Sequence, residues 1–337
     1  MSLAEEIGAH LAVGIPGTAA TSDVLDHLRA IHAQSLVVFA RNFTSVNQFK
    51  LLLEDLHQGL GRRLFVMVDH EGGRVIRFSE GVTRFPSAKE MAARGPKAIE
   101  EQGKTEAKEL RALGVHANLA PCADVLMEGC DPVIGDRSYG SQPDLVSACV
   151  RARIHGLQHH HGGLRHQGVS ACAKHFPGLG SVPADPHKTL PTVHLRWEEI
   201  EEMDLAPFEE AVAAGVEMVM SSHVCYPGLG EPPGQPATFS RRLIHGLLRE
   251  RLNFQGLVLT DDLDMGALQK GVGAGESAVR AVEAGHDLLL LCADRQSQLQ
   301  AYQALTEAYS SGRLPPSGLA STVERLHKVA EKSGLRP

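Results

Sequence analysis

Four short apolar runs in the sequence each stop abruptly at polar and ionisable residues. The first run stops at residues 69–71 (Asp, His, Glu), the second at 174–175 (Lys, His), the third at 221–223 (Ser, Ser, His) and the fourth at 260–262 (Thr, Asp, Asp). A single ending of this kind usually caps the next helix. Four of them favour a site where carboxylates and imidazoles move protons or attack a substrate.

Three carboxylates, Asp261, Asp262 and Asp264, fall within four positions at the fourth ending. Successive side chains on a strand point to opposite faces, so Asp261 and Asp262 cannot both face one site. We predict that Asp261, at the end of the strand, faces the site. Asp262 and Asp264 are predicted to cap a helix or form a turn.

The loop after the second run holds a candidate proton shuttle. Residues 174–191 include four prolines, which predict an irregular loop. Asp185 and His187 stand on either side of Pro186, so in an extended segment their side chains share one side of the chain. A neighbouring carboxylate fixes an imidazole's tautomer and makes it a usable proton donor and acceptor. A surface Asp–His turn is the alternative interpretation.

Other chemistries find weaker support in the sequence. The histidines at 159–161 are consecutive, so on a helix end they point in three directions, and neither a metal site nor a cofactor is predicted. There is no G-x-S-x-G motif, although the serines at 221 and 222 beside His223 keep serine-hydrolase chemistry open. The six cysteines form no C-x-x-C pair, which favours reduced thiols.

Eight apolar runs must position these groups, at residues 11–14, 36–40, 65–69, 116–119, 170–174, 218–222, 257–261 and 287–291. Segments with helical patterning separate most of them, at residues 24–33, 46–60, 96–113, 145–158, 198–214, 241–252, 276–284 and 296–310. This alternation predicts an α/β fold, a closed (β/α)8 TIM barrel, whose active site lies at the carboxyl ends of the strands. A doubly wound open sheet is the alternative, but residues 14–17 are not the Gly-rich turn typical of it.

No linker divides the chain, so residues 1–337 are predicted to form a single catalytic barrel domain. The stretch richest in glycine and proline, residues 228–236, sits between a strand and a helix as a barrel loop would. A last helix at residues 317–332 is expected to pack on the exterior of the barrel.

The charge and composition of the chain indicate which kinds of molecule it can bind. The 33 Lys and Arg against 40 Asp and Glu give a net charge of −7, which opposes binding to nucleic acid or to an anionic membrane surface. Residues 1–17 lack the basic start of a secretory signal, and no apolar stretch approaches the roughly 18 residues of a transmembrane helix. We expect a cytoplasmic protein that acts on a small molecule. The sequence does not indicate the oligomeric state.

Several motifs together resemble glycoside hydrolase family 3, and within it the NagZ-type β-N-acetylglucosaminidases. In the family's order they are VMVDHEGGRVIRF, NLAPCADV, IGDRSYG, KHFPG followed by ADPHKTLP, MSSHVCYPG, PATFS and LLRERLNFQGLVLTDDLDMGAL. The similarity runs from Val37 to Cys292, and its most specific part is the signature at residues 247–261.

The resemblance implies that Asp261 is the nucleophile, His187 the general acid/base and Asp185 its dyad partner. It also implies that five residues hold the N-acetylglucosamine ring: Asp69, Arg77, Arg137, Lys174 and His175. The sequence departs from the family at Leu179 and Ser181, where a histidine and an aspartate are common. These departures concern the packing and closure of the loop rather than the dyad.

The implied reaction is retaining hydrolysis of a terminal N-acetylglucosamine from a small carbohydrate or muropeptide derived from peptidoglycan, through a covalent glycosyl-Asp261. Three alternatives stay open at this point. A phosphorylase is one, because an imidazole acid/base does not repel an incoming phosphate. The others are a β-glucosidase of the same family and a sugar-binding barrel without catalysis, although binding alone needs neither a nucleophile nor a proton shuttle.

Overall fold

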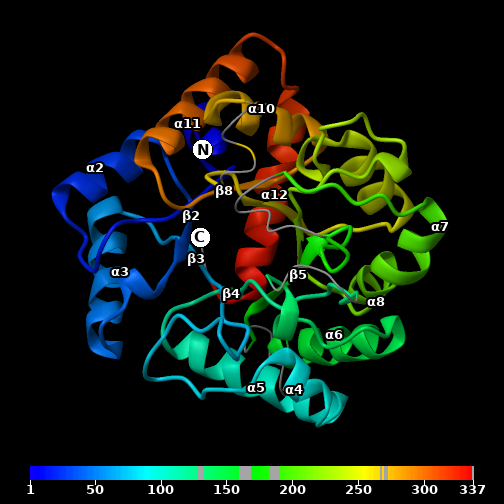
Figure 1. Cartoon of the computed structure of the whole chain (residues 1–337). Coiled ribbons are helices and arrows are strands. Elements are labelled where there is room, and N and C mark those ends of the chain that lie inside the picture. Colours follow the sequence, from blue (N-terminus) through cyan, green and yellow to red (C-terminus); the bar gives the residue numbers. More distant parts are fainter. Residues whose placement is uncertain (128–132, 159–167, 183–189, 266–267, 269–271, 336–337) are drawn as a thin grey trace.

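Eight parallel strands close into a barrel in chain order, with β1 paired to β8 (Figure 1). They are β1 (Leu11–Val13), β2 (Ser35–Val38), β3 (Phe65–Val68), β4 (Ala117–Asn118), β5 (Ser170–Phe176), β6 (Met218–Ser221), β7 (Leu257–Asp262) and β8 (Leu288–Leu291). This confirms the (β/α)8 barrel and each of the eight strands expected from the apolar runs. The computed structural model describes residues 1–127, 133–158, 168–182, 190–265, 268 and 272–335.

Helices form a ring around the strands (Figure 1). They are α1 (Leu3–Gly8), α2 (Ser22–Ala30), α3 (Val46–Leu60), α4 (Ala88–Ala92), α5 (Pro96–Ala112), α6 (Pro143–Leu157), α7 (Trp197–Ile200), α8 (Ala206–Ala213), α10 (Ala274–Ala284), α11 (Arg295–Ser310) and α12 (Pro316–Lys332). Two segments are of π type, η4 (Glu201–Leu205) between α7 and α8, and η7 (Arg242–Arg251). In the described part of the chain, no helix is long and apolar enough to span a bilayer.

Helix α3 shows why the sequence predicts these elements well. The Ser45 side chain accepts a hydrogen bond from the Gln48 N–H at its start, and Gly61 ends it with a φ of 69°, which favours glycine. Its buried face consists of Phe49, Leu52, Leu53 and Leu56, which recur at helical spacing. The expected range of residues 46–60 is therefore met residue for residue.

The barrel interior is filled by apolar side chains from all eight strands. They include Ala12, Val37, Phe65, Met67, Ala117, Cys172, Met218, Met220, Leu257, Leu259, Leu288 and Leu290. Large residues from β3, β6, β7 and β8 face small ones from β1 and β4, so the interior is a packed core rather than a pore.

The last helix completes that core from the amino-terminal end of the barrel. Leu326, Val329 and Ala330 of α12 belong to the same buried cluster as the interior residues. Around them, Arg325 lies 2.9 Å from Asp287, just before β8, and Lys332 lies 3.4 Å from Glu217, just before β6. Figure 1 shows α12, in red, crossing the centre of the barrel. The helix expected on the exterior thus covers one specific part of it, the amino-terminal opening.

Candidate active site

The ionisable residues singled out by the sequence gather at the carboxyl-terminal end of the barrel. Asp69 follows β3, Lys174 and His175 lie in β5, and Asp261 lies at the end of β7. Because all strands are parallel, these endings come to one face although they are far apart in sequence.

Lys174 is the centre of this site. Its ammonium nitrogen lies 2.6 Å from Asp69 Oδ1 and 2.7 Å from Glu71 Oε1, and the side chain is only 2% exposed. Arg77 approaches the other oxygen of Asp69, at 3.4 Å. One buried cation therefore holds two carboxylates that leave the end of β3 in a fixed arrangement.

Arg137 extends the network through Glu71. Its Nε and Nη2 donate to the two oxygens of Glu71 at 2.9 and 2.8 Å, which is a bidentate pair. The same Nη2 lies 3.4 Å from His175 Nε2. Arg137 comes from η2 (Gly135–Arg137), so a loop after β4 is tied to both β3 and β5.

His175 is oriented by Asp124, a buried residue in the loop after β4. The imidazole Nδ1 is 2.7 Å from Asp124 Oδ2, while Asp124 Oδ1 accepts from the backbone N–H of Leu179 at 2.7 Å and of His175 at 3.2 Å. With Nδ1 donating to the carboxylate, Nε2 of a neutral imidazole is the acceptor and faces Arg137.

The charges of these groups stabilise one another. Burial raises the pKa of Asp69, but Lys174 and Arg77 outweigh burial and hold that pKa below its ordinary value. The pKa of Glu71 is lowered far more, since burial is opposed by both Arg137 and Lys174. For Lys174, burial opposes the charge, yet the two carboxylates raise its pKa well above the usual value. All three groups are therefore charged at neutral pH.

The three carboxylates at the end of β7 differ in their partners, as the sequence predicts. Asp262 Oδ1 accepts the backbone N–H of Cys292 at 3.2 Å and of Asp264 at 3.1 Å. Asp264 in turn accepts two backbone N–H groups of the loop after β8, from Ala293 and Asp294. Burial raises the pKa of Asp262 to about 7. Asp262 and Asp264 thus hold the β7 and β8 loops together.

The carboxylate of Asp261 has a different partner from those of Asp262 and Asp264. Its Oδ1 accepts the N–H of Asp262 at 2.8 Å, and in the described residues this is the hydrogen bond found for its carboxylate. Asp261 stands at the carboxyl-terminal end of β7 and Asp69 directly after β3, so both lie at the same end of the barrel.

A buried ion pair supports the site from behind. Arg153 of α6 is 1% exposed and pairs with Glu106 of α5. The same guanidinium lies 3.4 Å from the carbonyl oxygen of His70 and 3.3 Å from that of Glu71. It thereby ties the loop after β3 to the helices that cover β4 and β5.

The hydrogen bonds of Ser221, Ser222 and His223 do not support serine-hydrolase chemistry. Ser221 Oγ bonds His286 Nε2 at 2.7 Å, and Ser222 Oγ lies 3.2 Å from the Tyr226 hydroxyl. His223 bonds Thr238 through Nδ1 and the Asp262 carbonyl through Nε2. These buried groups connect β6 to its neighbours.

One group of side chains could approach a metal ion. Ligand atoms of Cys122, Asp124 and His175 lie within 4.8 Å of one another. They are already hydrogen-bonded to each other, with Cys122 Sγ 3.1 Å from Asp124. Burial and the Asp124 charge raise the pKa of the Cys122 thiol well above its ordinary value, which disfavours the thiolate that a metal requires. The histidines at 159–161 lie outside the described residues.

The five residues expected to hold the sugar ring lie together, linked by ion pairs and close polar contacts: Asp69, Arg77, Arg137, Lys174 and His175. Asp185 and His187 lie outside the described residues. Of the two departures from the family, Leu179 is buried in the hydrophobic core and the Ser181 hydroxyl is buried as well.

Sequence reasoning missed Glu71 and Asp124, which connect the cations and the imidazole. Glu71 carried a usable signal, since it stands two positions after Asp69, the spacing that puts side chains on one side of an extended segment. Asp124 carried little, because it lies six residues beyond the two-residue strand β4.

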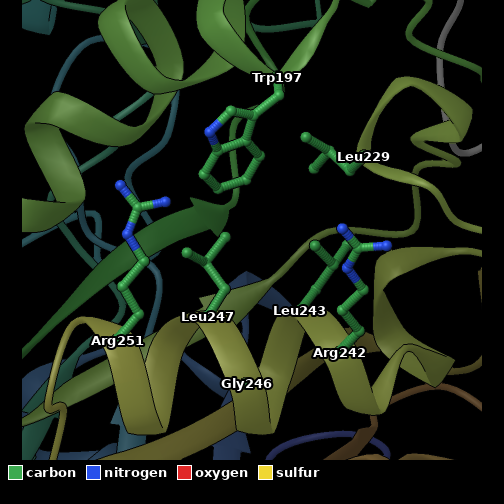
Figure 2. A pocket seen from close by; sticks show the side chains of 7 residues that line it. All are labelled: Trp197, Leu229, Arg242, Leu243, Gly246, Leu247 and Arg251. Atoms are coloured by element: carbon green, nitrogen blue, oxygen red, sulfur yellow. The ribbon is translucent and has the colours of Figure 1, made fainter.

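A second concavity lies outside the barrel mouth, between α7 and η7. Figure 2 shows Trp197 reaching from α7 toward η7, whose arginines stand at either side; the Arg251 guanidinium lies 4.8 Å from the Trp197 ring centroid. It encloses about 350 Å³ and is lined by Trp197, Leu229, Arg242, Leu243, Gly246, Leu247 and Arg251. With neither a carboxylate nor an imidazole in this described lining, it cannot supply acid/base chemistry.

Comparison with known proteins places this arrangement in a family. The family model for the glycosyl hydrolase family 3 N terminal domain matches residues 3–329. A beta-hexosaminidase of Thioalkalivibrio sulfidiphilus is 37% identical over 301 residues, 87% of this chain and 83% of the relative. A beta-hexosaminidase of Idiomarina loihiensis is 33% identical over 330 residues, 95% and 96% of the two chains.

Solved structures agree. The glycoside hydrolase family 3 beta-N-acetylglucosaminidase from Paenibacillus sp. str. FPU-7 matches with a TM-score of 0.94 at 36% identity, covering 99% of this chain. This chain spans 63% of that longer protein. NagZ from Neisseria gonorrhoeae, solved with N-trifluoroacetyl-D-glucosamine, matches with a TM-score of 0.75 at 29% identity over 96% of this chain and 98% of its own.

Proposed function

The chain belongs to glycoside hydrolase family 3 and is a hydrolase of O-glycosyl bonds, and from this premise we propose that it is a retaining exo-β-N-acetylglucosaminidase. Its proposed substrates are cytoplasmic peptidoglycan fragments, from which it removes a terminal N-acetylglucosamine. The observation that carries the proposal is the buried network of Asp69, Lys174, Glu71 and Arg137 at the carboxyl-terminal end of the barrel, the end at which the strand carrying Asp261 also finishes.

The network suits a neutral sugar ring. Asp69 presents a charged acceptor for ring hydroxyls, while Lys174 and Arg77 present charged donors. Charge-assisted hydrogen bonds of this kind contribute roughly 1.5–3 kcal/mol each when well aligned. Because the groups already fix one another, they need little rearrangement when the ring binds.

Asp261 is the proposed nucleophile. A retaining glycosidase needs an ionised carboxylate under the anomeric carbon, where it forms a covalent glycosyl-enzyme that water then hydrolyses. Asp262 and Asp264 are engaged by backbone N–H groups of the β8 loop, whereas the hydrogen bond found for the Asp261 carboxylate among the described residues is to the N–H of Asp262.

The proposed acid/base is His187, oriented by Asp185. This assignment rests on the family motif and on their spacing around Pro186. His187 protonates the leaving oxygen in the first step and takes a proton from water in the second. Neither step needs a metal ion or a cofactor.

The substrate class rests on the relatives. The curated relatives are named beta-hexosaminidases, one solved neighbour is a beta-N-acetylglucosaminidase, and NagZ was solved with an N-acylated glucosamine. The step from N-acetylglucosamine to peptidoglycan fragments follows the NagZ-type motifs of the sequence.

Initial rates on 4-nitrophenyl β-N-acetylglucosaminide and 4-nitrophenyl β-glucoside, each with and without phosphate and with and without EDTA, test the proposal. We expect preference for the N-acetyl substrate, free N-acetylglucosamine as product in phosphate buffer, and no effect of EDTA. Preference for the glucoside would point to a β-glucosidase, and a sugar 1-phosphate product to a phosphorylase. Absence of turnover on both substrates would contradict the enzyme proposal.

A further inference from the structure

A second polar pocket lies far from the barrel mouth, between α3 and the end of α5, where β3 and β4 begin. It encloses about 510 Å³. Its lining brings together three cations, Lys50, Arg63 and Arg111, and two imidazoles, His57 and His116. These residues come from α3, from α5 and from the segments that lead into the two strands. The reaction proposed above uses none of them.

The cations of this pocket lack carboxylate partners in the described part of the chain. The Arg111 guanidinium donates to the backbone carbonyls of Gly168 at 3.3 Å and Ser333 at 3.1 Å. The ion pairs and hydrogen bonds found among the described residues include none for Lys50 or Arg63. Burial lowers the pKa of Arg111, as expected for a guanidinium whose charge no carboxylate compensates.

The pKa values of the two imidazoles in the pocket are lowered by burial and by the neighbouring positive charges. Burial lowers the pKa of His116 to about 4, and the neighbouring His57, Arg111 and Arg63 add to the shift. The pKa of His57 is also lowered, first by burial and then by Arg63. Both rings are therefore neutral at pH 7, because burial, and after it the neighbouring positive charges, disfavours their protonation.

A neutral His116 offers a defined hydrogen-bond donor. The backbone N–H of Val66 donates to His116 Nδ1 at 3.0 Å, so the ring proton must reside on Nε2. The Nε2 atom of His57 is buried without a hydrogen-bond partner among the described residues. Cations and a fixed N–H donor thus line one pocket in a protein whose net charge is −7.

We propose that this pocket binds a phosphate-type oxyanion, either free or as the phosphate group of a small molecule. A tetrahedral oxyanion accepts several charge-assisted hydrogen bonds at once, and guanidinium groups match its geometry. Arg63 and Lys50, both exposed, supply charge, while His116, which also lines the pocket, supplies a neutral Nε2–H donor. The only acidic residue of the lining is Glu54, whose carboxylate accepts the Gln58 amide at 3.2 Å.

The test is calorimetric titration with inorganic phosphate and with glucose 6-phosphate, using sodium chloride of equal ionic strength as reference. Wild type should bind, and Arg63→Ala should weaken binding about tenfold, since a charge-assisted contact is lost. Lys108→Ala is the matched control, because Lys108 is an exposed cation outside the pocket on α5, the helix that carries Arg111. Glu54→Gln removes the acidic rim charge and should tighten binding.

Tighter binding of glucose 6-phosphate than of phosphate would identify a phosphorylated small molecule as the ligand, and the reverse order would identify the free ion. The proposal fails if phosphate and chloride give the same heat, or if Arg63→Ala and Lys108→Ala bind phosphate equally. Because the pocket contains no residue of the barrel mouth, turnover of N-acetylglucosaminides should be unchanged in Arg63→Ala. This result is independent of whether the proposed reaction is correct.

Discussion

The barrel mouth and the pocket between α3 and α5 treat charge in opposite ways. At the mouth Lys174 and Arg137 are buried and paired with carboxylates, whereas in the pocket Arg63 is exposed and the hydrogen bonds of Arg111 to the described residues are to backbone carbonyls. Balanced charges fix a shape and leave no net attraction for ions, which suits an uncharged sugar. Unbalanced charges attract anions. The position of the countercharge, rather than the number of cations, thus separates the two regions.

The largest effect should come from Asp261 at the carboxyl-terminal end. We expect Asp261→Asn to lower kcat by about 10³-fold or more, because the covalent step loses its nucleophile, while the affinity for N-acetylglucosamine stays close to that of wild type. A slow 5-fluoro glycosyl donor should label wild type, with the adduct mapped by mass spectrometry to residues 256–265. Asp262→Asn, the matched control, should still be labelled. Labelling at Asp262 or Asp69, or an inverted first product, would contradict the assignment.

The next effect concerns the proposed proton donor. His187→Ala should slow glycosides with poor leaving groups by about 10²–10⁴-fold but affect activated aryl glycosides much less, because a good leaving group needs little protonation. Asp185→Ala should show the same selectivity in milder form. The measurement is a series of aryl glycosides with leaving groups of increasing pKa. Equal losses along the series would assign the acid role to another residue.

Glu71 tests the balanced network directly. Glu71→Gln leaves Lys174 and Arg137 with one carboxylate fewer in a buried site, and breaking a buried pair costs about 3–5 kcal/mol. We expect a lower free energy of unfolding in urea and a raised KM, since ring-binding groups lose their fixed positions. Glu210→Gln is the control, because Glu210 pairs with Arg151 at the surface, where a pair contributes less than about 1 kcal/mol. Similar losses in both variants would show that the network has no special role.

At the amino-terminal end, we expect a substitution in the buried face of α12 to lower the stability and to leave catalysis unchanged. Leu326 of α12 is 2% exposed in the interior cluster, and a buried Leu→Ala change costs about 2–5 kcal/mol. We expect Leu326→Ala to unfold at lower urea concentration with kcat and KM unchanged, the reverse of the pattern for Asp261→Asn. Leu51→Ala is the control, since Leu51 is 58% exposed. A large change in KM would mean that α12 influences the site through the barrel.

The last prediction concerns the pH dependence of stability and Asp204, the exception at the carboxyl-terminal end. Its side chain is fully buried, and burial together with the Asp124 charge raises its pKa to about 8, although a side-chain hydrogen bond with Ser181 opposes the shift. A raised pKa means that the folded state holds this proton more tightly than the unfolded state. Its stabilising contribution is complete below the unfolded pKa of 3.8 and is lost as the pH rises to about 8.

Asp204→Asn cannot lose a proton, so its stability relative to wild type should rise between pH 4 and pH 8 and then level off. Urea unfolding across this range measures the difference. An unchanged difference would mean that Asp204 is ionised in the folded protein at neutral pH.

The sequence predicts the fold well because the signal is local and repeated. Each strand is a short apolar run and each helix an amphipathic segment, so the limits of α3 and β3 could be placed within a residue. The convergence of Asp69 and Lys174, 105 positions apart, follows only once a closed parallel barrel is assumed. The role of Asp124 could not be foreseen, because the burial that makes it a partner of His175 comes from loops without a repeating pattern.

The position of α12 shows another limit. Its apolar residues at 319, 326, 329 and 330 predict that one face of the helix packs against another part of the protein. Hydrophobic patterning does not say which surface it covers, since the outer ring and the barrel opening are both apolar. The choice depends on polar contacts with strand beginnings, such as Arg325 with Asp287.

The same helix sets an order of events during synthesis. Strand β1 finds its second partner only in β8, and the interior between them is sealed by residues that follow all eight strands. As the chain emerges from the ribosome, the core side chains of the early strands stay accessible to water until α12 has been synthesised and covers them. Local βα units can form on the way, but the cooperative step is postponed until α12 has been made. Until then, the nascent chain exposes the apolar amino-terminal opening of the barrel, a surface that chaperones could recognise.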